Sequence, residues 1–184
     1  MVVVYRRAIE MIRSNVALAS LFVVAVLACP RAASAGARQI HGGPTAGFAT
    51  LIGREFAIGG AVGGHLGYGI SDAFRVYGSI DLPAGASITD GAFALWPGAA
   101  IGVAYSLDNL SVVPWIGLEA RMHVPFARSA AGWAVGGGAR VGVDWLATRY
   151  LGLSVQGSYN ALFFDGGLAH SVTVIAGPRW TVDL

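Results

Sequence analysis

Beyond residue 35, the chain alternates with a period of two between apolar positions and small or polar positions. In the stretch Glu55–Ile70, the even positions are apolar or glycine, and the odd positions hold only Glu, His, Ala and Gly. Successive side chains of a β-strand point to opposite faces, so this pattern predicts a strand between two different environments. No stretch of this region shows a helical repeat, and the pattern therefore predicts an all-β protein.

The same alternation recurs along the chain. Further strands are predicted at 74–82, 95–105, 110–123, 133–145, 151–160 and 171–183, and a first strand is expected near 47–52. Short polar breaks, typical of tight turns, lie at 71–73, 107–109 and 147–149, and longer breaks lie at 83–93, 124–132 and 162–169. Eight strands joined by short and long connections in alternation predict a closed antiparallel up-and-down barrel that spans a membrane.

The placement of charge identifies the outer environment as lipid. The apolar faces of the predicted strands carry no Asp, Glu, Arg or Lys. A charge that faces lipid at mid-membrane costs about 2–4 kcal/mol, and a soluble β-sandwich would place its charges on the outside instead. The opposite face is therefore predicted to line the barrel interior. It carries the charged residues Glu55, Arg75, Asp81, Glu119, Arg121, Arg140, Asp144, Arg179 and Asp183.

These interior charges include both signs, so they allow two interpretations. They could form a selectivity ring in a pore, or a network of ion pairs that closes the lumen. Eight strands leave an interior just wide enough for side chains to fill, and Tyr77, Trp96 and Trp115 also point inward. We therefore favour the closed lumen. An unpaired charge in such a lumen would be costly, which favours pairing between strands.

Aromatic residues on the apolar faces lie near the predicted strand ends. Tyr68, Phe74, Tyr105 and Trp145 adjoin short turns, whereas Trp133 and Tyr159 adjoin long loops. Amphipathic rings favour the headgroup level of a bilayer.

Two features of the pattern fit less simply. Residues 91–107 carry no charge, but they include Pro97 and are too few for a spanning helix of roughly 20 residues, so a strand with its loop is preferred. Pro97, Pro114 and Pro178 fall inside predicted strands, although a closed barrel has no edge where a missing N–H is tolerated. We interpret them as bulges or strand ends.

The first 35 residues predict a secretory signal peptide. Arg6, Arg7 and Arg13 precede an uncharged apolar run at 16–28, and the small residues 33–35 (Ala-Ser-Ala) form a cleavage site. The apolar run is too short to cross roughly 30 Å of hydrocarbon. Lipidation at Cys29 is a weaker alternative, because Ala-Ser-Ala accounts for cleavage without it.

Composition excludes several functional classes for residues 36–184. The whole chain is 55% hydrophobic and 12% charged, and its one cysteine lies in the signal segment. From Gly36 onward there are 8 Arg and 9 Asp plus Glu, which gives −1. This region therefore offers neither a thiol nor a basic surface for nucleic acid.

No pattern of catalytic or metal-binding residues stands out. His65, His123 and His170 lie on different predicted strands, without the spacing of a metal site. The pair His170-Ser171, with Asp165 as a third member, weakly resembles the catalytic His and Ser of outer-membrane lipid A deacylases. Adjacent residues of a strand point to opposite faces, which weakens that interpretation.

The signal peptide, the eight alternating runs and the alternation of turns and loops resemble the small outer-membrane barrels of the OmpA and OmpX kind. The resemblance covers residues 36–184. The last run, Gly177–Leu184, is similar to the C-terminal signal read by the barrel-assembly machinery, which commonly ends in Phe rather than Leu.

The resemblance implies an integral protein of the outer membrane of a Gram-negative-type bacterium. Its expected partners are outer-membrane lipid, lipopolysaccharide and, during biogenesis, the barrel-assembly machinery. We expect a non-enzymatic structural or surface-interaction role, with no cofactor and no nucleic acid. The alternatives are a lipid-modifying barrel enzyme and a narrow pore.

The mature protein is expected to begin at Gly36. N-terminal sequencing of the protein purified from cells checks this expectation. An N-terminus at Met1, or a lipidated Cys29, would contradict the predicted cleavage site.

Overall fold

The computed structural model describes residues 38–53, 56–88, 91–107, 111–124, 126–127, 130–164 and 167–184. The predicted signal peptide (1–35) and Glu55 lie outside these residues. The strands are β1 (Gln39–Ile52), β2 (Phe56–Gly69), β3 (Phe74–Ser87), β4 (Phe93–Leu95), β5 (Gly98–Ser106), β6 (Val112–His123), β7 (Phe126–Ala127), β8 (Ala130–Ala131), β9 (Ala134–Leu146), β10 (Leu151–Phe164) and β11 (Gly167–Asp183). No helix among the described residues has the length and apolar character required to cross a bilayer.

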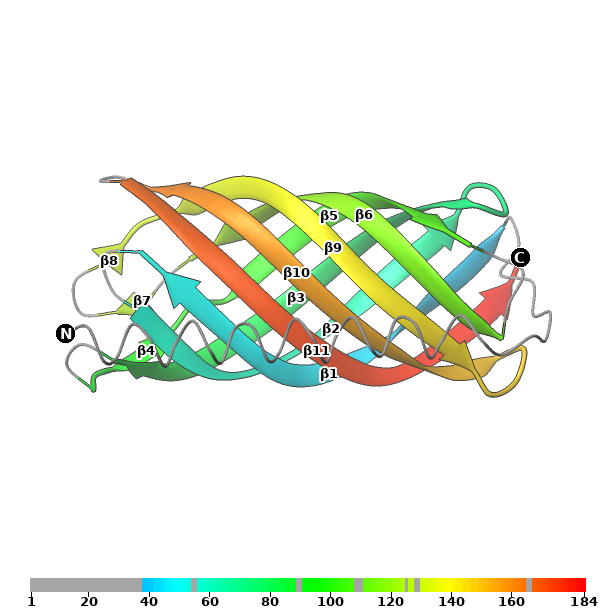
Figure 1. Cartoon of the computed structure of the whole chain (residues 1–184), viewed down its shortest axis with the longest axis horizontal. Helices are drawn as coiled ribbons and strands as arrows, with labels where there is room; N and C mark the ends of the chain where they lie inside the picture. The colour runs from blue at the N-terminus through cyan, green and yellow to red at the C-terminus, as the bar shows by residue number, and fades with distance from the viewer. Residues whose placement is uncertain are drawn as a thin grey trace, which may run out of the picture. The chain divides into compact units, whose positions relative to one another are not determined.

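The strands form one closed antiparallel barrel (Figure 1). β4, β7 and β8 are continuations of β5, β6 and β9, because the pair Leu95↔Phe126 has the same register as Gly98↔His123. The wall therefore consists of eight long strands, closed where β1 pairs with β11. The predicted all-β, eight-stranded, up-and-down barrel is confirmed.

Several predicted boundaries were wrong. β1 begins at Gln39, well before the expected start at 47, because its glycines and Pro44 obscure the alternation. β3 continues to Ser87 and β10 to Phe164, into stretches predicted to be long loops. Small residues such as those at 84–86 blur the apolar pattern but still pair with neighbouring strands.

The strands are staggered around the barrel. When paired residues are followed from strand to strand, the path that leaves β1 at Ile40 returns to β1 at Thr50, 10 residues further along. The intermediate residues are Tyr68, Val76, Val103, Leu118, Ala139, Tyr159 and Val172. With strand spacings of roughly 4.8 Å and rises of roughly 3.3 Å per residue, this stagger tilts the strands by about 40°. Such a tilt leaves a narrow interior that side chains can fill.

The outer surface is apolar along the whole wall. Phe48, Ile80 and Leu118 are 72%, 69% and 68% exposed, whereas their sequence neighbours Ala49, Ser79 and Glu119 are buried inside. The aromatic residues assigned to the outside from the sequence are all exposed, and Phe74 and Tyr105 make an edge contact beside a short turn.

The short turns close with local hydrogen bonds. The Ser71 hydroxyl accepts from the Phe74 N–H, and the Thr148 hydroxyl accepts from the N–H groups of Tyr150 and Leu151. Side-chain acceptors of this kind replace the missing ladder partners where a strand reverses.

The prolines occupy positions where the ladder is already broken or ends. Between residues 42 and 46 of β1, the β1–β11 ladder is interrupted, and there Pro44 lies opposite Pro178. Neither residue has an N–H to donate, so the two prolines share a single gap. Glycine is required on both sides of this gap, because a Cβ at Gly43 or Gly177 would collide with the facing proline carbonyl.

Pro97 and Pro114, the other prolines that the sequence placed inside predicted strands, each lie where one ladder ends, although Pro114 still pairs with Val143 of β9. Pro97 separates β4 from β5, and its carbonyl accepts from the Val124 N–H. Pro114 faces Leu107 beyond the Ser106↔Trp115 pair, at the turn end of the β5–β6 hairpin, and its carbonyl accepts from the Leu107 N–H.

The two surfaces should respond differently to charge. Val141 at the middle of β9 and Leu107 beside a short turn are both 51% exposed. Val141→Arg should destabilise the barrel by about 2–4 kcal/mol, and Leu107→Arg by no more than about 1 kcal/mol, because the penalty falls towards the interfaces. Urea unfolding in lipid vesicles measures both values. Equal losses would mean that Val141 does not face hydrocarbon.

Candidate functional site in the barrel interior

The structure brings together seven of the nine charged residues that the sequence assigned to the interior. They are Arg75, Asp81, Glu119, Arg121, Arg140, Asp144 and Arg179, and all are buried. Asp183 is not among them: β11 ends there, and its side chain lies at the rim, 34% exposed. It accepts from Gln39 at 2.7 Å and pairs with Arg149 of the neighbouring turn. Glu55 lies outside the described residues.

One cluster of buried charges surrounds Asp144. Its Oδ2 atom accepts from Nη1 of Arg75 at 2.8 Å and from Nη1 of Arg179 at 2.7 Å. Its Oδ1 atom accepts from the Ser154 hydroxyl at 2.6 Å. These partners come from β3, β11 and β10, so a single carboxylate on β9 joins four strands. The Arg75 guanidinium also stacks on Trp115, 4.3 Å from the ring centroid.

A second cluster surrounds Glu119 on β6. Its Oε1 atom accepts from Nε of Arg121 at 3.1 Å and from the Asn160 amide at 2.9 Å. Its Oε2 atom lies 2.7 Å from Nε of Arg140 and accepts from the Tyr77 hydroxyl at 3.3 Å. A further ion pair links Arg121 to Asp81 at 2.8 Å.

Polar side chains connect the two clusters. Gln156 accepts from Arg140 at 3.3 Å and donates to the Ser154 hydroxyl at 3.0 Å, which in turn donates to Asp144. Towards the long-loop end the interior becomes apolar, with Trp96 and Leu162 fully buried. The described interior thus consists of a connected polar region and an apolar region between it and the long-loop end.

Inward glycines make room for the large rings. Tyr77 lies over Gly102 of the neighbouring strand, and Trp115 lies over Gly142, so that a Cβ at either glycine would collide with the ring. His41 lies over Gly67 in the same way. The glycine content of the chain therefore serves partly to fit aromatic and imidazole rings into a narrow lumen.

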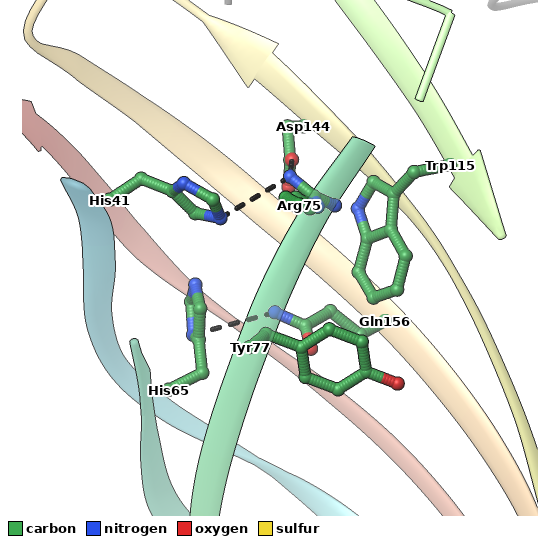
Figure 2. A pocket seen from close by; sticks show the side chains of 7 residues that line it. All are labelled: His41, His65, Arg75, Tyr77, Trp115, Asp144 and Gln156. Carbon is green, nitrogen blue, oxygen red and sulfur yellow. Dashed lines mark hydrogen bonds and ion pairs between the residues drawn. The ribbon is translucent and has the colours of Figure 1, made fainter. Parts of the chain in front are cut away.

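A small cavity remains beside the Asp144 cluster. Its volume is about 10 Å³, which is room for about one water molecule. Figure 2 shows its lining residues, in which Nε2 of His41 lies 3.4 Å from Arg75 and Nδ1 of His65 lies 3.4 Å from Gln156. The lining residues are His41, His65, Arg75, Tyr77, Trp115, Asp144 and Gln156.

Sequence reasoning missed three members of the site. His41 was missed because the first strand was expected to begin at residue 47. The alternation does continue upstream, since the polar residues 39, 41 and 45 share one face and the non-polar residues 40, 42 and 44 share the other. Ser154 and Gln156 were placed on the inward face, but nothing in the sequence shows that they connect the two charge clusters.

The structure separates the residues considered for catalysis. His170 lies on the outer side, where Nδ1 meets the Tyr159 hydroxyl at 2.7 Å, whereas Ser171 is fully buried inside. Asp165 lies outside the described residues. Within the described part of the chain, His, Cys, Asp and Glu form no group of three or more that could hold a metal ion.

Solved structures with the same architecture identify the fold. Neisserial surface protein A (NspA) aligns at 18% identity with a TM-score of 0.60, covering 77% of this chain and 96% of that one. The outer membrane protein OprG from Pseudomonas aeruginosa aligns at 12% identity with a TM-score of 0.55, covering 81% and 98%. This is the fold of the small eight-stranded outer-membrane barrels. No family model matches the sequence, and no curated protein matches it.

Removal of one partner from the buried network should be costly. Arg140→Ala leaves Glu119 without its shortest ion pair and should destabilise the barrel by about 3–5 kcal/mol. The control is Arg149→Ala, whose side chain is 65% exposed and whose pair with Asp183 should contribute at most about 1 kcal/mol. Urea titration of both variants measures the difference. Comparable losses would show that the interior pairs add no more stability than a surface pair.

Proposed function

We propose that this chain is an integral outer-membrane barrel with a structural or surface-interaction role and a lumen closed by its own side chains. The observation that carries the proposal is the buried network of ion pairs, which reaches across the interior from β3, β6, β9, β10 and β11. A conducting pore needs a continuous hydrated path, whereas these charged groups are directly paired.

The energetics favour a closed lumen. A buried carboxylate that bonds several donors holds each of them in place, and its removal leaves uncompensated charge. Trp96 and Leu162 add an apolar layer towards the long-loop end, where water would find no hydrogen-bond partners. Two successive barriers, one ionic and one apolar, therefore oppose ion passage.

The apolar outer surface and the predicted signal peptide support the remaining parts of the proposal. The peptide would direct export and be removed, and the barrel-assembly machinery would insert the barrel among outer-membrane lipid and lipopolysaccharide. The loops at the long-loop end would then meet the cell exterior. His170 lies on the outer side of the barrel and Ser171 is buried inside, so these two residues do not form a catalytic pair. Their separation favours a non-enzymatic role.

Planar-bilayer recording tests the closed lumen. The pure wild-type protein should give no steady single-channel current. The variant Tyr77→Ala/Trp115→Ala removes two buried rings from the polar region and should conduct more than the wild type. Faster migration of the unheated than of the boiled variant on SDS gels shows that the variant is folded. Large, reproducible wild-type currents would instead establish a pore. Lipid A from cells with and without the protein should be identical, and a changed acyl pattern would establish the enzyme.

A further inference from the structure

Two histidines from neighbouring strands meet in the polar region of the interior. His41 on β1 and His65 on β2 both line the small cavity beside Asp144, and their ring centroids are 6.5 Å apart (Figure 2). Each ring has one nitrogen 3.4 Å from a polar side chain of the buried network, Arg75 for His41 and Gln156 for His65. The protonation of the two rings and the hydrogen bonds of the network are therefore linked.

The contact of His41 assigns the position of its proton. Nη1 of Arg75 faces Nε2 of His41, and a guanidinium group can only donate. Nε2 is therefore the unprotonated, accepting nitrogen, and the ring is neutral with its proton on Nδ1. A second proton, on Nε2, would set donor against donor and positive charge against positive charge. The contact with Arg75 would then break.

His65 is neutral for a similar reason. The side-chain oxygen of Gln156 accepts from Arg140, so the Gln156 nitrogen is the atom that faces Nδ1 of His65. This nitrogen donates one hydrogen to the Ser154 hydroxyl and has a second one for His65. Nδ1 of His65 is therefore the acceptor, and the ring carries its proton on Nε2. A proton on Nδ1 would displace Gln156, which connects the two charge clusters.

We propose that His41 and His65 form an acid-sensitive latch in the barrel interior. At neutral pH, both rings accept hydrogen bonds and hold Arg75 and Gln156 in place. Uptake of a proton by either ring removes one acceptor and releases its donor, which loosens the polar region. Histidine suits this role because it is the side chain that ordinarily changes charge between neutral and mildly acidic pH.

Other groups around the rings add to the same effect. The described charged and titratable side chains that face the two rings are Arg75 and Tyr77 of β3, Arg140 and Asp144 of β9, and Arg179 of β11. Asp144 is the carboxylate of this set, and both of its oxygens already accept hydrogen bonds. A proton on either ring would have to compete for this carboxylate, so its uptake disturbs the existing contacts.

Acid should therefore destabilise the folded barrel. In the unfolded chain, histidines take up protons below about pH 6.5. In the folded barrel, these two rings take up a proton only when their hydrogen bonds break. Unfolding is then accompanied by proton uptake, and linkage requires that stability decreases as the pH falls from about 7.5 to about 5. The latch does not depend on whether the lumen conducts, so the bilayer recordings and the acid experiments can fail separately.

Urea unfolding of the protein in lipid vesicles, at about pH 7.5 and about pH 5, tests the latch. The wild-type urea midpoint should be lower at the lower pH. The double variant His41→Gln/His65→Asn replaces each accepting nitrogen by an accepting oxygen that does not titrate. Its midpoint should fall by no more than about half as much, with the remainder due to the buried ring of His123. The control His170→Gln changes a ring on the outer side and should show the full wild-type drop.

Nitrogen NMR of the wild-type protein, labelled in its histidines and held in detergent micelles, gives a direct test whether or not the variants fold. At about pH 7.5, His41 should be neutral with its proton on Nδ1, and His65 neutral with its proton on Nε2. The proposal is overturned by the opposite tautomer or a charged ring at either position. It is also overturned by equal wild-type midpoints at the two pH values, or by a folded double variant that shows the full wild-type drop.

Discussion

The sharing of Asp144 between Arg75 and Arg179 is the contact on which the barrel interior depends. A carboxylate that accepts from β3, β10 and β11 joins strands that lie far apart in the sequence and on different sides of the lumen. Such a contact is strong only when nearly all of its hydrogen-bonding capacity is used, because desolvation of the ions is costly. Ser154 supplies the third hydrogen bond to this carboxylate, Gln156 donates to Ser154 in turn, and Trp115 stacks on Arg75.

The same contact imposes limits on the wall. Large rings such as those of Tyr77 and Trp115 fit inside eight strands only where the adjacent positions carry no side chain, and inward glycines supply those positions. The stagger of the strands then brings residues from distant sequence positions to one level. The small cavity beside Asp144 arises where this packing is incomplete.

In the membrane location that we propose, the outer surface obeys a different constraint, since it must present no charge and no free backbone donor to lipid. The pairing of Pro44 with Pro178 shows how a closed barrel accommodates proline. Two residues that lack an N–H lie opposite each other, so that one gap in the β1–β11 ladder serves both. The gap lies between the first and last strands, where the barrel closes.

The sequence by itself determined the fold class, the strand count and the face on which most residues lie, because a wall with an apolar outer surface and a filled, largely polar lumen requires strict alternation. It also determined that charges of both signs share the interior. It did not determine where β1 begins, since glycine and proline carry little information about either face.

Only the tertiary structure decided which charges meet. Arg75 and Asp144 are 69 residues apart and are brought together by the stagger of the barrel, which no local pattern encodes. The structure also moved Asp183 from the interior to the rim, because the strand ends there, and added His41 to the site. Alternation specifies the face on which a side chain lies but not its height along the barrel axis, and contacts across the lumen depend on both.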